Sequence, residues 1–297
     1  MASDVELAAM RQAITLSALG LGTASPNPPV GCVILDRHGT VVGAGFHRRK
    51  GEAHAEANAL NAAGTAARGG TAVVTLEPCN HAGVTPACRQ ALLDAGIARV
   101  VISVIDPTSR GDGGAAVLAA AGVDVETGVL HDEALTVLGP WLTATVQRRP
   151  YLIWVYGAEA DQRPTVTAQL LLALRGRADL VVANKVLEEG IPGGHAPAHY
   201  TLPPDSDLDA DLWGWLSATY QAGTRTALIA GSEYAETLHQ QMNVVDEIIL
   251  STRRTDLAEV LTALQPHAIP AGFQLVDVTP SARAVLARFR RPLQGQA

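Results

Sequence analysis

The chain has 297 residues, 47% of them hydrophobic and 17% charged, so we expect nearly its whole length to fold, most simply as two domains. A net charge of −7 and the lack of any long run of lysine or arginine argue against nucleic acid as a partner. The N-terminus lacks the basic start and apolar core of a signal peptide, and no apolar run reaches membrane length, so we predict a cytoplasmic protein with no membrane partner.

The first expected element is an amphipathic helix. Ser3 and Glu6 have the spacing of a capping box, and apolar residues then recur at helical spacing as far as residues 20–22. The prolines of residues 25–29 exclude a helix from the next stretch, because each proline also restricts the residue before it. They predict a rigid, extended loop that contains Asn27.

A β-hairpin and a second helix are expected next. Two apolar, β-branched runs, residues 30–35 and 41–46, are separated by a polar Asp-Arg-His-Gly stretch, which favours a hairpin. Cys32 lies within the first run and is expected to be a buried strand residue. The alanine-rich stretch 54–62 favours a helix that Gly64 stops.

Strands and helices then alternate through the rest of the first half. The expected elements are a strand at 71–76, a helix from Thr85 or Pro86 to Leu93, a strand at 99–105, a helix at 114–121, a strand at 123–126 and a helix at 132–146. Strand–helix–strand connections imply parallel pairing. The first half is therefore predicted to be an α/β domain, a mixed sheet with helices on both faces.

One histidine and two of the three cysteines form the most informative pattern in the chain. His54, Cys79 and Cys88 are residue types that bind Zn²⁺, and three protein ligands with an open fourth position are typical of a catalytic zinc site. Glu56 follows the histidine by two residues, where it can reach a metal-bound water and shuttle protons. Zinc nucleobase deaminases have this general arrangement.

The two cysteines depart from the general deaminase pattern in their spacing. Eight residues separate Cys79 from Cys88 where the general pattern has two, so residues 80–87 are expected to loop out and line a substrate pocket. Both metal-binding segments are expected to begin helices, whose N-termini would stabilise the thiolates. The alternative is that His54 and the cysteines are ordinary core residues, since free cysteine is often a small buried hydrophobe.

Several spaced motifs in the first half agree with one known family. They are Ser25-Pro26-Asn27-Pro28-Pro29-Val30-Gly31, Gly45-Phe46-His47, His54-Ala55-Glu56, Leu76-Glu77-Pro78-Cys79-Asn80-His81, Gly83, Thr85-Pro86, Cys88 and Asp106-Pro107. Together they resemble the riboflavin-biosynthesis deaminase family, whose bifunctional members join an N-terminal zinc deaminase to a C-terminal reductase. The resemblance implies a cytidine-deaminase-like domain at residues 1–147 and a shortened, dihydrofolate-reductase-like α/β domain at residues 148–297.

The resemblance also implies a reaction. An amino-pyrimidine, diaminohydroxyphosphoribosylaminopyrimidine, would be hydrolytically deaminated, with its 2-amino group replaced by a carbonyl and ammonia released. Zn²⁺ held by His54, Cys79 and Cys88 is the implied cofactor. Glu56 is the implied catalytic residue that takes the proton of the water and returns it to a ring nitrogen and to the leaving ammonia.

The same resemblance implies six substrate-binding residues, which are Asn27, His47, His81, Val84, Asp106 and Thr108. Two of them depart from the family. Val84 stands where the family usually has a lysine or arginine for the substrate phosphate, and Thr108 replaces an asparagine. One of the three cations at 48–50 could take over the phosphate contact. The alternative is a specialised-metabolism deaminase that acts on a related amino-heterocycle without that contact.

The second half departs further from the family's reductase. Strands are expected at 151–156, 180–183, 227–230, 247–251 and 273–278. However, Val155 occupies the family's lysine position, residues 159–162 lack the usual Ser-x-Asp-Gly turn, the loop 184–187 lacks the usual glycines, and residues 231–232 replace a Gly-Gly phosphate turn. We expect no bound nicotinamide cofactor and no reductase activity, and a structural role such as support of a homo-oligomer.

Two further alternatives are a dead scaffold and a second metal site. A catalytically dead scaffold would require decay of the zinc ligands, which the sequence does not show. His195 and His199 lie in a glycine- and proline-rich stretch and could suggest a second metal site, but no cysteine or acidic residue accompanies them in the sequence.

Overall fold

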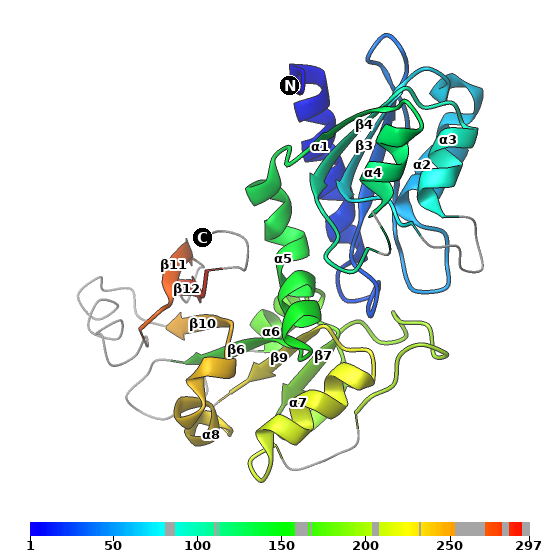
Figure 1. The fold of residues 1–297 in the computed structure, drawn as a ribbon. Coiled ribbons are helices and arrows are strands. Elements are labelled where there is room, and N and C mark those ends of the chain that lie inside the picture. Colours follow the sequence, from blue (N-terminus) through cyan, green and yellow to red (C-terminus); the bar gives the residue numbers. More distant parts are fainter. Residues whose placement is uncertain are drawn as a thin grey trace. The chain divides into compact units, whose positions relative to one another are not determined.

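The computed structural model describes residues 1–80, 87–109, 111, 113–157, 166, 168–203, 208–231, 233–252, 271–280 and 285–292. The chain forms two compact units, Met1–Leu142 and Thr143–Ala297, each with its own sheet (Figure 1). The division falls inside helix α5 (His131–Gln147), and the end of that helix coincides with the boundary predicted between residues 147 and 148. That boundary stays a prediction about the functional domains.

The first unit is built on a five-stranded mixed sheet with strand order β2-β1-β3-β4-β5. Its strands are β1 (Gly31–Leu35), β2 (Val41–Phe46), β3 (Thr71–Leu76), β4 (Arg99–Val104) and β5 (Asp124–Thr127). β1 pairs antiparallel with β2 and β3, whereas β3, β4 and β5 run parallel. The predicted hairpin and the parallel β3–β4 connection are confirmed.

Helix α1 (Asp4–Ser17) begins at the predicted capping box. Ser3 Oγ accepts a hydrogen bond from Glu6 N at 3.3 Å, and Glu6 Oε2 accepts one from Ser3 N at 2.8 Å. The other oxygen, Glu6 Oε1, accepts one from Arg99 Nε at 2.7 Å, which ties the start of α1 to the start of β4. The apolar side of α1 packs against one face of the sheet in a core that comprises Ala9, Met10, Ala13, Val33, Leu35, Val73, Val101 and Val129.

Helix α2 (Ala55–Ala63) packs very closely on the other face of the sheet, because two glycines of β2 face it. A Cβ on Gly43 would lie 2.2 Å from Ala59 O, and a Cβ on Gly45 would lie 2.7 Å from Ala59 N. Larger residues at these positions would push α2, and the histidine that precedes it, away from the sheet. Gly64, at φ 55°, ends the helix as predicted.

Three more α-helices begin among the described residues of the first unit. They are α3 (Cys88–Asp94), α4 (Gly113–Ala120) and α5. The ends of α4 and α5 lie within one residue of the expected positions, while the start expected for α3 at Thr85 or Pro86 lies outside the described residues. A mixed sheet with helices on both faces is therefore confirmed.

The second unit contains a seven-stranded sheet with strand order β11-β12-β10-β6-β9-β7-β8. Its strands are β6 (Tyr151–Gly157), β7 (Leu180–Ala183), β8 (Val186–Glu189), β9 (Thr226–Ala230), β10 (Glu247–Thr252), β11 (Gln274–Pro280) and β12 (Val285–Arg290). The central strands β10, β6, β9 and β7 are parallel. Strands β8, β12 and β11 add antiparallel pairs at the two sides.

The helices of the second unit are α6 (Ala168–Arg175), α7 (Leu212–Gln221) and α8 (Ala235–Gln240) among the described residues. One face of the sheet forms a large core with α7 and α8, in which Trp154 of β6 and Trp215 of α7 are both buried. Burial of these two indoles and of the aliphatic residues around them gives the second unit a hydrophobic core of its own.

Two strands of the second unit differ from the sequence expectation. The stretch 184–187 was expected to be a loop, but Val186 and Leu187 belong to β8. Asn184 and Lys185 have φ values of 51° and 62°, which make a two-residue hairpin turn whose twist suits the flanking strands. Strand β12 lies outside the expected strands, although its alternation of buried and half-buried residues has the period of two that is typical of a strand.

A buried ion pair fixes the entry to the second unit. Asp246 accepts two hydrogen bonds from the Arg149 guanidinium, at 2.7 and 2.9 Å, and a third from Leu152 N at 2.8 Å. Both side chains are buried. The paired geometry joins the segment that precedes β6 to the segment that precedes β10.

In the described ranges, none of the helices combines the length and the apolar character that crossing a bilayer requires.

Replacing Arg149 with methionine should destabilise the second unit by about 3–5 kcal/mol, because Asp246 would remain buried without its charged partner. Urea unfolding followed by tryptophan fluorescence measures the change. The signal reports on this unit, which contains three of the four tryptophans, Trp154, Trp213 and Trp215.

The control is Glu188→Gln, which breaks an ion pair with Arg175 on the surface of the second unit, the unit on which the signal reports. Exposed pairs contribute little, so this variant should lose less than about 1 kcal/mol. Similar small losses in the two variants would contradict the importance assigned to the buried pair.

Candidate metal centre and active site

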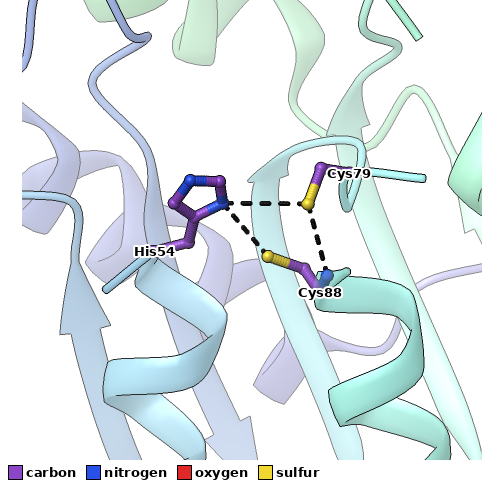
Figure 2. Close-up of side chains that lie close together, drawn as sticks. All are labelled: His54, Cys79 and Cys88. Carbon is purple, nitrogen blue, oxygen red and sulfur yellow. Dashed lines mark hydrogen bonds between the residues drawn. The ribbon is translucent and has the colours of Figure 1, made fainter. Parts of the chain in front are cut away.

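The predicted metal ligands meet at one point, where two helices begin and one strand ends. His54 is the N-cap of α2, Cys88 is the first residue of α3, and Cys79 lies three residues beyond the end of β3 (Figure 2). His54 Nδ1 lies 3.2 Å from Cys88 Sγ and 3.8 Å from Cys79 Sγ. The three ligand atoms all lie within 4.8 Å of one another.

These distances fit a tetrahedral zinc site. With Zn–N of about 2.0 Å and Zn–S of about 2.3 Å, tetrahedral angles place a nitrogen and a sulfur ligand about 3.5 Å apart. The two observed N···S distances lie on either side of that value. Within the described residues this is the group of side chains that could hold a metal ion, and one nitrogen with two sulfurs is a donor set that Zn²⁺ prefers.

The electrostatics of the site favour a thiolate. Cys79 Sγ accepts hydrogen bonds from two groups of Cys88, the thiol and the backbone N–H, the latter at 3.2 Å. Together with His54, these donors lower the pKa of Cys79 to about 4, although burial of the thiol acts in the opposite direction. The Cys79 sulfur in turn raises the pKa of His54. A divalent cation would take the place of the shared protons, because metal ligands must be deprotonated.

Glu56 lies in the first turn of α2, two residues after the ligand His54. It is 3% exposed, and burial raises the pKa of its carboxyl group. A carboxyl group held close to the metal ligands in a dry setting, with a raised pKa, can both accept and return a proton.

Asn27 and His47, two of the predicted substrate-binding residues, form a pair beside the metal ligands. Asn27 Nδ2 lies 3.1 Å from His47 Nε2, and His47 Nδ1 lies 3.1 Å from Ala53 O. The ring of His47 meets the ring of His54 edge-on, with centroids 5.1 Å apart. Burial lowers the pKa of His47, which favours a neutral ring that donates from Nδ1 to the carbonyl and accepts at Nε2.

The other predicted substrate residues are placed less completely. Asp106 and Thr108 lie in the loop after β4, where Asp106 Oδ1 accepts from Thr108 N at 2.8 Å and from Thr108 Oγ1 at 2.7 Å. The structure therefore brings these two together in a local turn. His81 and Val84 lie outside the described residues.

Cys32 and the proposed second metal site are separate from this centre. Cys32 is fully buried in β1, as predicted, and burial raises the pKa of its thiol. The expectation that His195 has no acidic partner is wrong. Its Nδ1 lies 2.6 Å from Glu189 Oε1 and its Nε2 lies 3.1 Å from Asp179 Oδ1, because the β7–β8 hairpin brings both carboxylates to the ring.

That group in the second unit is an ion-pair cluster and not one of the described groups that could hold a metal. Burial alone would lower the pKa of His195, but the hydrogen bonds and charges of Asp179 and Glu189 outweigh it and raise that pKa. The ring stacks on Tyr200, with centroids 3.9 Å apart. We assign this cluster a structural role, in which it fixes the segment around residue 195 against the sheet.

Three residues that support the site were not expected from the sequence. Trp141 Nε1 donates to Pro26 O at 3.1 Å and so holds the loop that carries Asn27. Asn58 Nδ2 donates to Phe46 O at 2.9 Å, next to His47. The Ser109 hydroxyl donates to the buried carboxylate of Glu77, which lies two residues before Cys79. These contacts join residues 12 to 115 positions apart in the chain, and no local motif indicates them.

The fold and the metal centre define the first unit as a deaminase domain of the zinc-binding type. In agreement, the family described as the cytidine and deoxycytidylate deaminase zinc-binding region matches residues 3–104. The chain belongs to the RibD family of riboflavin-biosynthesis proteins. RibD of Aquifex aeolicus is 32% identical over 263 residues, which cover 81% of this chain and 73% of that protein.

Two further relatives cover the first unit. The diaminohydroxyphosphoribosylamino-pyrimidine deaminase of Buchnera aphidicola (subsp. Acyrthosiphon pisum) is 53% identical over 126 residues, 42% of this chain and 85% of that protein. RibD of Escherichia coli is 44% identical over 160 residues, and the match spans only 43% of its length. The solved structure of Acinetobacter baumannii RibD is 26% identical, covers 97% of this chain and 99% of its own, and has a TM-score of 0.76.

The predicted fold class is therefore confirmed: a deaminase domain is followed by a reductase-like α/β domain. The convergence of the three candidate ligand atoms favours a metal site over the alternative that His54 and the two cysteines are ordinary core residues.

Cys79→Ser and Cys88→Ser should each lose bound zinc, from about one ion per chain to a small fraction, because two remaining ligands hold the metal poorly. Metal analysis of the purified variants checks this. Cys32→Ala is the matched control, since it removes a buried thiol that is not a ligand, and it should keep its zinc. Full zinc in either serine variant would remove that cysteine from the ligand set.

Proposed function

We propose that the first unit hydrolytically deaminates an amino-pyrimidine, diaminohydroxyphosphoribosylaminopyrimidine, with the 2-amino group leaving as ammonia. The observation that carries this proposal is the convergence of His54, Cys79 and Cys88 beside the buried carboxyl group of Glu56. The Buchnera relative named for this deamination, which matches this unit at 53% identity, supports the choice of substrate.

In the proposed mechanism His54, Cys79 and Cys88 hold Zn²⁺. When bound, zinc supplies hydroxide near neutral pH by lowering the pKa of water. Glu56 takes a proton from water, which burial favours by raising the pKa of its carboxyl group, and passes that proton to a ring nitrogen of the substrate while the water oxygen bonds to the amine-bearing carbon. Glu56 then takes the remaining proton of that oxygen and gives it to the amino group, so that the C–N bond breaks, ammonia departs neutral and a carbonyl remains.

Asn27 and His47 would orient the pyrimidine. Because Ala53 O fixes the His47 Nδ1–H, the opposite ring nitrogen faces Asn27 as an acceptor. The Asn27 amide keeps its carbonyl oxygen for a substrate donor, and we propose the same general role for His81 and Asp106. Burial of His47 excludes water from this side of the site.

A second candidate function is deamination of a related amino-heterocycle that lacks the phosphate. One observation favours it. The Thr108 hydroxyl donates to Asp106 Oδ1 at 2.7 Å, so its donor is used within the loop and does not replace a substrate contact of the family's asparagine. Val84 provides no charge for a phosphate. Under the first candidate function, Arg48, Arg49 or Lys50 would have to bind the substrate phosphate. Such a charge-assisted contact contributes about 1.5–3 kcal/mol to binding.

We also propose that the second unit has lost reductase activity and acts as a structural domain of a homo-oligomer. Val155, which stands at the family's lysine position, is buried in β6 and offers no charged group. Asn184 and Lys185 form a tight hairpin turn in place of a glycine-rich loop. Buried Trp154 and Trp215 support a fold that is maintained without a cofactor.

Glu56→Gln should keep zinc and fold but lower turnover by about 10²–10⁴-fold, because the amide can hydrogen-bond to water but cannot carry its proton. Ammonia release and zinc content, measured on the same preparation, check this. Glu133→Gln is the control, since it neutralises an exposed carboxylate of α5 and should leave both values unchanged. Turnover of Glu56→Gln near the wild-type rate would rule out the assigned role.

NADPH should not bind tightly to the full chain. The buried Val155 and the residue 184–185 turn leave the second unit without the charged and glycine-rich elements that hold a nicotinamide cofactor in the family. Calorimetric titration with NADPH measures this directly, and the expected result is no heat of binding in the micromolar range. A micromolar dissociation constant would mean that other groups had taken over cofactor binding.

A further inference from the structure

Glu77 is a buried carboxylate next to the metal centre that the proposed mechanism does not use. It follows directly after β3, lies two residues before the ligand Cys79, and is 5% exposed. Its Oε1 accepts a hydrogen bond from Ala115 N at 2.9 Å. Its Oε2 accepts from Ser109 Oγ at 2.8 Å and from Asp106 N at 3.3 Å.

The three donors come from two other segments of the chain. Asp106 and Ser109 belong to the loop after β4, and Ala115 lies in the first turn of α4. The loop at 106–109 is closed on itself by the two bonds from Thr108 to Asp106, so its backbone is braced from within. A single carboxylate therefore joins the metal-ligand segment to the loop and to a helix N-terminus, where a negative charge is favoured.

The contact between α4 and this segment leaves no spare room. A Cβ on Gly113, which has a φ of +83°, would lie 2.5 Å from Glu77 Oε1. A Cβ on Gly114 would lie 1.9 Å from Pro78 O. The start of α4 thus lies directly against residues 77 and 78, and the position of the loop is set by the metal-ligand segment itself.

We propose that Glu77 is a positioning residue for deamination: it holds the 106–109 loop, with Asp106, at a fixed place relative to the metal ligand Cys79. The inference rests on the proposed function in assigning substrate contact to Asp106. Without the carboxylate, the metal ligands and Glu56 would keep their positions. The 106–109 loop, which carries Asp106, would no longer be fixed relative to them.

The test variant is Glu77→Gln, which keeps the size of the side chain. One of its two terminal groups becomes an N–H donor, so either Ala115 N or Asp106 N loses its acceptor and faces another donor. Loss of one buried acceptor should weaken substrate binding by about ten-fold. We expect the KM for the pyrimidine substrate to rise by that factor, with kcat and zinc content little changed, as for an effect on binding rather than on chemistry.

Glu6→Gln is the matched control. Glu6 of α1 is also a buried carboxylate that accepts from a helix N-terminus, at Ser3 N, and from a side chain. That side chain is Arg99 at the start of β4, whereas the 106–109 loop follows the end of the strand. It should lower the stability of the first unit without changing KM. An unchanged KM in Glu77→Gln, or a rise matched by Glu6→Gln, would overturn the proposal.

A measurement that does not depend on activity separates this inference from the proposed function. Amide hydrogen exchange of the zinc-loaded full chain should become faster at Asp106 or Ala115 in Glu77→Gln and not in Glu6→Gln, because one of these two amides loses its acceptor. Unchanged exchange there would overturn the positioning role even if the protein proved to be a deaminase. Faster exchange in Glu77→Gln, together with a wild-type protein that fails to deaminate, would leave the positioning of the loop supported and the proposed function contradicted.

Discussion

The active site depends on the start of two helices being held beside the end of one strand. His54 and Cys88 each stand at a helix N-terminus, and Cys79 follows β3 between them in the sequence. Helix α2 reaches this place only because Gly43 and Gly45 allow its backbone to contact the sheet directly. Two thiols and an imidazole brought so close compete for protons, and a divalent cation would resolve that competition. The same close packing buries Glu56 and thereby raises its pKa, so the metal binding and the proton transfer that we propose would have one structural cause.

Much of the first unit could be predicted from the sequence, because its signals are local. The capping box at Ser3, the glycine after α2 and the alternating apolar strands each lie within a few residues of the element that they define. The candidate metal ligands were also identifiable, since the chain has only three cysteines and the pattern includes an acidic residue at a fixed offset from His54. The convergence of the ligand atoms agrees with that reading.

The residues that hold the site in place could not be predicted in the same way. Glu77 is visible in the sequence beside Pro78, but its three donors lie 29 to 38 residues further along the chain. Likewise, the acidic partners of His195 become neighbours only because Asn184 and Lys185 turn the chain back into a hairpin. In both cases tertiary contacts bring the interacting residues together, and the pattern of a single sequence does not show which distant residues will become neighbours.

The account is tested most directly by incubating the purified, zinc-loaded chain with diaminohydroxyphosphoribosylaminopyrimidine and measuring ammonia. It predicts one ammonia per substrate consumed, loss of the activity when a chelator removes the zinc, and recovery when zinc is restored, as expected for chemistry that depends on a three-ligand metal site. A protein with full zinc that releases no ammonia from this compound or from its dephosphorylated form would contradict the assignment.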